Sequence, residues 1–167
     1  MQTTHPSAAA PLETSLIRTI RGFQASQAIH AAAELGVVDS LASGPPTAAG
    51  VASACGAQEA ALRRLLRFLT AIDILTEDAS GRFAPTDMGQ LLRADHPQSV
   101  KAWAVVFGSP QFWQPWGELT QALRTGRPGF NLAFGEPHFT FLSHRPADAA
   151  AFNAAMTSGT HSQMGAI

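Results

Sequence analysis

The sequence predicts a mainly α-helical protein in which a winged helix is followed by a second helical segment. Three features support this: apolar residues at helical spacing along most of the 167 residues, two short extended runs near residues 74–85, and a concentration of aromatic residues after Val100. A hydrophobic content of 46% is enough for a substantial core. We divide the chain into a tail at residues 1–11, a winged-helix domain at 12–95 and a helical segment at 96–167.

The amino-terminal region combines a solvated tail with one long helix. Residues 1–11 lack apolar periodicity and contain two prolines. From Leu12 to Leu35 the spacing of Leu16, Ile20 and Phe23 predicts a continuous helix, which Gly36 would end. Its small residues would let another helix approach closely, so this helix either packs in the core or pairs with another molecule: Ala25, Ala28, Ala31, Ala32 and Ala33.

Residues 37–72 have helix-turn-helix spacing. The run VVDSLAS begins a short helical turn that stops at residues 44–46. Thr47 is a suitable cap for a helix at 48–54, Gly56 makes the turn, and a second helix is expected at 58–72. The second helix would place leucines on one face and three arginines on the other: Arg63, Arg64 and Arg67.

Two extended runs after this helix predict a small β hairpin. They cover residues 74–77 and 82–85 and are joined around the turn sequence Asp-Ala-Ser-Gly. A turn of helix is expected at residues 86–92. The hairpin would supply the wing of a winged helix.

Aromatic residues dominate the apolar positions from Val100 onward. All three tryptophans and seven of the ten phenylalanines lie between Trp103 and Phe152. We expect helices near 98–107 and 112–124, a turn at 126–129, and further helices near 136–143 and 147–159.

Charge and composition argue against several classes of protein. A formal net charge of −1 and a pI near 6.6 give no concentrated basic surface, so a nucleic-acid partner is not expected. The three-arginine helix face nevertheless keeps a DNA-binding regulator with a ligand-sensing aromatic pocket as the alternative, against an ordinary solvated helix face. The single Cys55 cannot form an intramolecular disulfide, and the scattered histidines have no metal-ligand spacing. No apolar run is long enough to cross a membrane and the start is not signal-like, so a cytoplasmic location is expected.

The ordered series of motifs resembles the amino-terminal half of class I S-adenosylmethionine-dependent O-methyltransferases of the plant caffeate and bacterial polyketide types. The resemblance rests on AIHAAAELGVVDSLASGP, on the wing sequence GRFAPTDMGQLL, and on FNLAFGEPHFTFL followed by FNAAM. It implies a winged helix that serves homodimerisation and does not read DNA, with a long first helix that wraps the partner. It also implies a small aromatic acceptor and S-adenosylmethionine as cofactor.

The resemblance assigns roles to particular residues. Phe152 and Met156 match the F and M of the F-N-x-x-M pattern and would contact the acceptor ring, although residues four apart on a helix also pack in cores. Thr160 stands where a serine or threonine approaches the cofactor, or it bonds its own backbone. Two other positions fall near the acceptor pocket, Asn131 and His138. Four further rings either line this pocket or are structural: Trp103, Phe107, Trp113 and Trp116.

The resemblance also predicts what this chain does not supply. No strand, turn and helix with G-x-G spacing occurs before Ile167, so the α/β cofactor domain is expected to be absent and the chain inactive alone. The family's catalytic histidine lies in that later domain, so no catalytic residue is assigned here. A separate chain carrying the cofactor domain would complete such an enzyme, and a member that keeps the pocket for another reaction is an open alternative.

Overall fold

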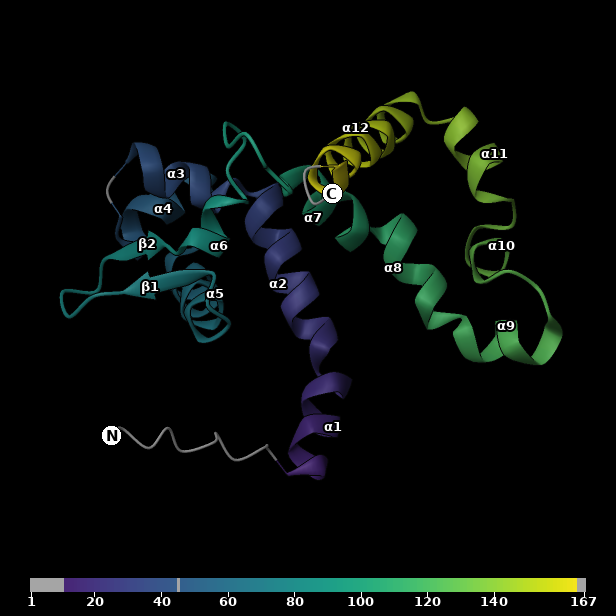
Figure 1. Cartoon of the computed structure of the whole chain (residues 1–167), viewed down its shortest axis with the longest axis horizontal. Coiled ribbons are helices and arrows are strands. Elements are labelled where there is room, and N and C mark those ends of the chain that lie inside the picture. The colour runs from purple at the N-terminus through teal and green to yellow at the C-terminus, as the bar shows by residue number, and fades with distance from the viewer. Residues whose placement is uncertain (1–10, 45, 165–167) are drawn as a thin grey trace.

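The structure has two groups of elements on either side of a central helical column. The computed structural model describes residues 11–44 and 46–164, with side chains up to Thr157. The column consists of α1 (Leu12–Ile20) and α2 (Gly22–Glu34). Figure 1 shows the winged helix on one side of α2 and the aromatic-rich helices on the other, while α1 extends beyond both.

The expected single helix at residues 12–35 is two helices that meet at Arg21. The Arg21 N–H still donates to the Ile17 carbonyl, but Gln24 N–H bonds back to the Arg21 carbonyl in a tighter turn, at 3.0 Å each. Gly22 begins the second helix, and glycine weakens a helix interior by about 0.5–1 kcal/mol relative to alanine. Low helix propensity at Gly22 therefore explains why the helix breaks at Arg21.

A leucine-rich core holds the winged helix together. Its helices are α3 (Val37–Ser43), α4 (Ala48–Cys55) and α5 (Glu59–Ala71). Thr47 accepts a hydrogen bond from Gly50 N–H and caps α4, and Gly56 ends this helix at a φ of 64°. The leucine face predicted for α5 is confirmed, since three of its leucines are buried in the core: Leu62, Leu66 and Leu69.

The wing is a two-stranded antiparallel hairpin of β1 (Leu75–Glu77) and β2 (Phe83–Pro85). Leu75 pairs with Pro85 and Glu77 with Phe83, so the buried Leu75 and Phe83 side chains enter the core. In the turn, one Asp78 carboxylate oxygen accepts hydrogen bonds from Ser80 N–H and Arg82 N–H, at 2.9 Å each. A short helix after the hairpin, α6 (Asp87–Gln90), is capped by Thr86.

Six helices follow within the described residues, where the sequence predicts four, and the last of them is longer than expected. They are α7 (Lys101–Gly108), α8 (Pro110–Gly117), α9 (Leu119–Thr125), α10 (Gly129–Phe134), α11 (His138–Ser143) and α12 (Pro146–Met164). The expected helix at 112–124 is divided at Glu118, because Pro115 lacks an N–H and Gly117 follows it. The helix at 129–134 is not predicted from the sequence, although Gly135, at a φ of 81°, ends it in the usual way.

The two groups of elements are joined where α2 crosses α7 at very short range. Gln27 Nε2 donates to the Gly108 carbonyl at 3.0 Å, and His30 Nδ1 lies 3.1 Å from the Ala104 carbonyl. A Cβ atom placed on Gly108 would lie 2.2 Å from Cβ of His30, which no side chain can tolerate. Glycine at this position therefore sets how closely the two helices approach.

Asp39 makes a second link between the two groups. Its carboxylate accepts hydrogen bonds from Lys101 Nζ at 2.6 Å and from Ala94 N–H at 2.8 Å. Burial opposes ionisation of this carboxyl, but the bonds from Lys101 and Ala94 outweigh it and hold the pKa of Asp39 below its ordinary value. The ionised carboxylate thus connects α3 to the start of α7.

We predict that Gly108→Ala destabilises the protein by about 1–3 kcal/mol, because α2 and α7 must separate to admit the methyl group. Gly117→Ala is the matched control, since a Cβ atom at that position meets nothing within 4 Å. Chemical denaturation of both variants would measure the difference. Equal stabilities would contradict the proposed close contact.

Candidate functional site

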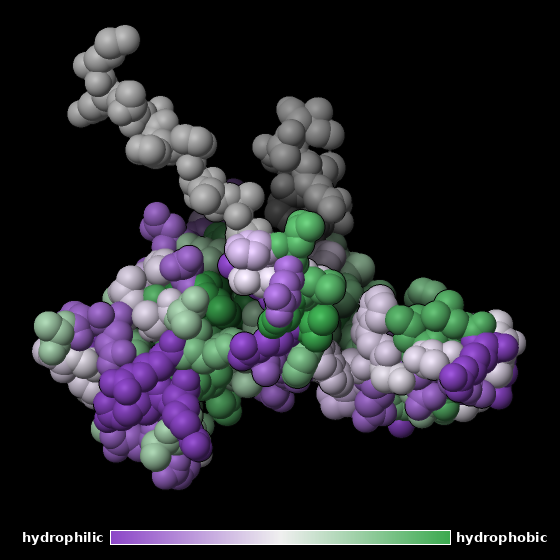
Figure 2. All heavy atoms as spheres, turned by 90° about the horizontal axis from the view of Figure 1, so that it is seen from below, coloured by the Kyte–Doolittle hydropathy of each residue, from purple (hydrophilic) through white to green (hydrophobic). Residues whose placement is uncertain are grey.

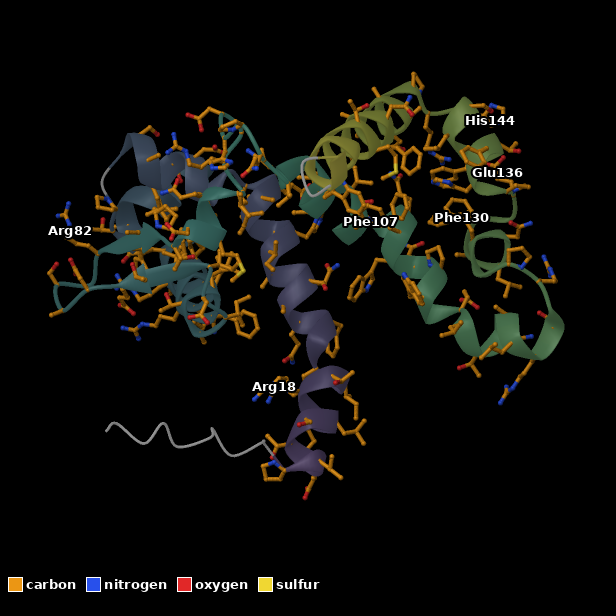
Figure 3. All side chains as sticks on the ribbon, viewed as in Figure 1. Arg18, Arg82, Phe107, Phe130, Glu136 and His144 are labelled. Atoms are coloured by element: carbon orange, nitrogen blue, oxygen red, sulfur yellow. The ribbon has the colours of Figure 1, made fainter. Side chains whose placement is uncertain are left out.

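Five helices of the second group contribute aromatic side chains to one connected cluster. Its centre is formed by Phe112, His138 and Phe152, whose ring centroids lie 5.3–5.9 Å apart. Phe130 lies 4.8 Å from His138 and 5.3 Å from Phe141. Figure 3 shows Phe130 inside the arc made by α8, α10, α11 and α12. We call this set the ring cluster: Phe112, Phe130, Phe134, His138, Phe141 and Phe152.

Local sequence places these rings on facing sides of short helices. Phe130 and Phe134 are four apart on α10 and contact each other at 4.8 Å. Gly129 lets α10 approach α8, since a Cβ atom there would lie 2.7 Å from the Pro115 carbonyl oxygen. Frequent breaks in the chain therefore bring rings from neighbouring helices together.

The cluster continues onto α7 through stacked rings. Trp103 and Phe107 are stacked with centroids 4.6 Å apart, and Phe107 lies 4.9 Å from Phe112. Four residues that the sequence suggests for an acceptor site are therefore joined in one network: Trp103, Phe107, His138 and Phe152.

Two polar ring atoms in this network are buried without a hydrogen-bond partner among the described residues. They are Nε1 of Trp103 and Nε2 of His138. Leaving such an atom unpaired costs about 1–3 kcal/mol. Burial also lowers the pKa of His138 below its ordinary value, so its imidazole is neutral at pH 7.

The remaining candidate residues are Met156, Asn131 and Thr160. Met156 is half-buried on α12, one turn after Phe152. Asn131 is half-buried on α10, beside Phe130 in sequence. Thr160 lies in α12, but its side chain is outside the described residues.

Trp113 faces a different part of the molecule from the ring cluster. It contacts Phe23 of α2 at 6.5 Å and lines two open grooves together with Trp116. The grooves have volumes of about 450 and 350 Å³, and Phe107 lines the smaller one. The ring contact of Trp113 is therefore with α2.

Sequence reasoning missed Phe112, Phe130, Phe134 and Phe141 as members of the site. The spacing of Phe130 and Phe134 at i and i+4, followed by Gly135, was the available signal for α10. Phe112 carried no comparable signal, because its contacts are with residues on other helices.

The arginine face of α5 is partly neutralised. Arg63 pairs with Glu59 at 2.7 Å, and Arg67 pairs with Glu77 of the wing at 3.3 Å. Both pairs are solvent-exposed and reduce the positive potential that phosphate binding requires. This arrangement favours a solvated helix face.

Two other kinds of site are not found within the described part of the chain. No group of three or more histidine, cysteine, aspartate or glutamate side chains there could hold a metal ion. None of the described helices is both long and apolar enough to cross a membrane.

Comparison with known proteins finds a family model that matches the amino-terminal part of the chain and relatives that match more of it. Residues 17–95 match the O-methyltransferase dimerisation domain. The chain is 36% identical over 146 residues to 3-amino-4-hydroxybenzoate 4-O-methyltransferase of Streptomyces cremeus, covering 87% of this chain and 40% of that protein.

Solved structures show the same similarity. LaPhzM superposes with a TM-score of 0.85 at 31% identity, over 90% of this chain and 45% of LaPhzM. The O-methyltransferase NcsB1 from neocarzinostatin biosynthesis, solved with S-adenosylmethionine and 2-hydroxy-5-methyl naphthoic acid, superposes with a TM-score of 0.71 at 30% identity. That match covers 95% of this chain and 46% of NcsB1, so the chain spans less than half the length of these relatives.

We predict that Phe112→Ala destabilises the protein by about 2–4 kcal/mol, because Phe112 contacts rings from three other helices. Phe139→Ala is the control, since the Phe139 side chain is 76% exposed and its loss should change stability by less than about 0.5 kcal/mol. Urea unfolding followed by tryptophan fluorescence would measure both. A Phe112→Ala variant as stable as the control would show that the cluster is not a packed unit.

Proposed function

We propose that this chain forms the subunit-pairing and acceptor-binding part of an S-adenosylmethionine-dependent O-methyltransferase. It belongs to the O-methyltransferase family through its dimerisation domain at residues 17–95. The acceptor would be a hydroxyl group on a small aromatic or polyketide molecule. The observation that carries this proposal is the ring cluster, which is attached through α2 and α7 to the dimerisation domain.

An exposed apolar face supports pairing with a second copy. Leu12, Leu16, Ile20 and Phe23 recur at helical spacing along the column, and all four are exposed. Figure 2, seen from below, shows hydrophobic surface at the centre of this face, where α1 points toward the viewer. A monomer rarely leaves so regular an apolar stripe uncovered, so we assign this stripe to the homodimer interface.

An apolar groove continues this surface on the other side of α1. It has a volume of about 500 Å³ and lies between the column and α5. Ile17, Phe68 and Ile72 provide apolar walls, and Arg18 and Arg21 lie at its edge. A helix of the second copy would bury both faces of α1 at once.

The chemistry of the ring cluster suits a flat aromatic acceptor. Rings and a thioether hold a planar molecule by contact area, while a few polar atoms fix its orientation. We propose that Phe152, Met156, Trp103, Phe107 and His138 line this site, together with Phe112 and Phe130. Asn131 would lie at its edge, and Trp113 would take part through the groove that it shares with Phe107.

The cofactor and the base would come from outside the described residues. Methyl transfer requires the acceptor oxygen and the sulfonium methyl group to be held in near-attack geometry, with a base to deprotonate the hydroxyl. In this proposal the chain positions the acceptor, Thr160 approaches the cofactor, and a cofactor domain of this or another chain supplies the rest. The chain alone would then not transfer methyl groups.

Charge placed on the apolar stripe should dissociate the homodimer. Leu16→Glu combined with Ile20→Glu would bury two carboxylates at the interface, and we expect dimer affinity to fall by more than about tenfold. Sedimentation velocity over a range of protein concentrations would measure this change. Gln121→Glu on the exposed surface of α9, away from the column, should leave the dimer intact, and a wild-type chain that sediments as a monomer at all concentrations would contradict the pairing role.

Ligand selectivity tests the acceptor-binding role directly. We expect 2-naphthol to bind this chain with a Kd of about 0.1–1 mM, as a small ligand on half a pocket should, and S-adenosylmethionine not to bind in the micromolar range. Tryptophan fluorescence and calorimetry would measure the two affinities, with NcsB1 as the cofactor-binding control. Micromolar binding of S-adenosylmethionine, or no binding of 2-naphthol at millimolar concentration, would contradict the proposal.

A further inference from the structure

The ring cluster contains a neutral imidazole whose environment is otherwise apolar. His138 makes ring contacts at 4.8–5.5 Å with four phenylalanines, three on other helices and one, Phe139, on its own helix. The other three are Phe112, Phe130 and Phe152. Its Nε2 atom is buried and has no hydrogen-bond partner among the described residues. A phenylalanine would fill the same space without this cost, so the polar atom needs an explanation.

Neighbouring charged groups make contacts that do not involve this nitrogen. His144 pairs with Glu136 at 4.0 Å on the exposed side of α11, as Figure 3 shows for these two residues. The Arg145 guanidinium lies 3.7 Å from the centroid of Phe141. Neither of these contacts involves Nε2 of His138.

The phenyl rings around His138 are an internal alternative to a hydrogen bond. His138 is steeply inclined to Phe112, Phe130 and Phe152, at 73°, 67° and 82°. An imidazole N–H pointing at a phenyl face makes only a weak contact, much weaker than a bond to oxygen. A hydroxyl group that reached the cluster would therefore displace this contact.

We propose that Nε2 of His138 hydrogen-bonds a hydroxyl group carried by the aromatic acceptor, and that this bond sets which hydroxylated ring the site accepts. The inference rests on the proposed acceptor-binding function and adds the chemical group that is recognised. A hydroxyl both donates and accepts, so it satisfies either tautomer of a neutral imidazole, whereas a carboxylate only accepts. A bond made inside an apolar cage is also strongly selective, because an acceptor without the hydroxyl leaves the nitrogen unpaired.

The test compares two ligands on two proteins. His138→Phe keeps an aromatic ring among the phenylalanines, one atom larger, and removes both nitrogens. We expect this variant to bind 2-naphthol about tenfold more weakly than the wild type, and naphthalene within about twofold of the wild type. Amide chemical-shift titrations of the whole chain measure both, and Phe139→Leu, at the neighbouring exposed ring, serves as the matched control.

A second measurement reads the nitrogen itself. In protein labelled with ¹⁵N at the histidine rings, 2-naphthol should shift the Nε2 resonance of His138, and naphthalene should not. A His138→Phe variant that loses equal affinity for both ligands, or an Nε2 resonance that stays unchanged as 2-naphthol saturates, would overturn the inference while leaving the acceptor site in place. Failure of 2-naphthol to bind the wild type at all would overturn the proposed function, and this inference with it.

Discussion

The close approach of α2 to α7 is the contact on which the rest of the structure depends. Gly108 removes the side chain that would keep the helices apart, and His30 occupies the space that it leaves. Two hydrogen bonds to α7 carbonyls fix the register of the pair. Because Trp103 and Phe107 lie on α7, this contact also determines where the ring cluster lies relative to the winged helix.

The winged helix has a packed apolar core of its own. Its buried leucines and the wing form one core, and the arginines that would face a nucleic acid are largely paired with carboxylates. The apolar stripe runs along α1 and the start of α2, and the groove lies between these helices and α5. Under the proposed function, a fold that reads DNA in other proteins would here present surface for protein contact.

The sequence predicts the winged helix well, because its elements are defined locally. Thr47, Gly56 and the leucine spacing of α5 each determine structure within a few residues of themselves. The aromatic half is predicted less accurately. Pro115, Gly117 and Gly129 divide it into short helices, and the partners of each ring lie on other helices. Phe112 has no sequence neighbour that marks it as central, whereas the order of motifs along the chain, in addition to their spacing, points to Phe152 and His138.

The ring cluster and the leucine core share almost no side chains, although they lie in one chain. The cluster draws its rings from α8, α10, α11 and α12, and the core of the winged helix is built from α2 to α5, the wing and Leu92. Substitutions that reshape the cluster therefore leave the packing of the winged helix unchanged. If the proposed function holds, evolution could change which molecule the ring cluster accepts while the surface proposed to pair two subunits stays the same, so substrate range and assembly could change independently.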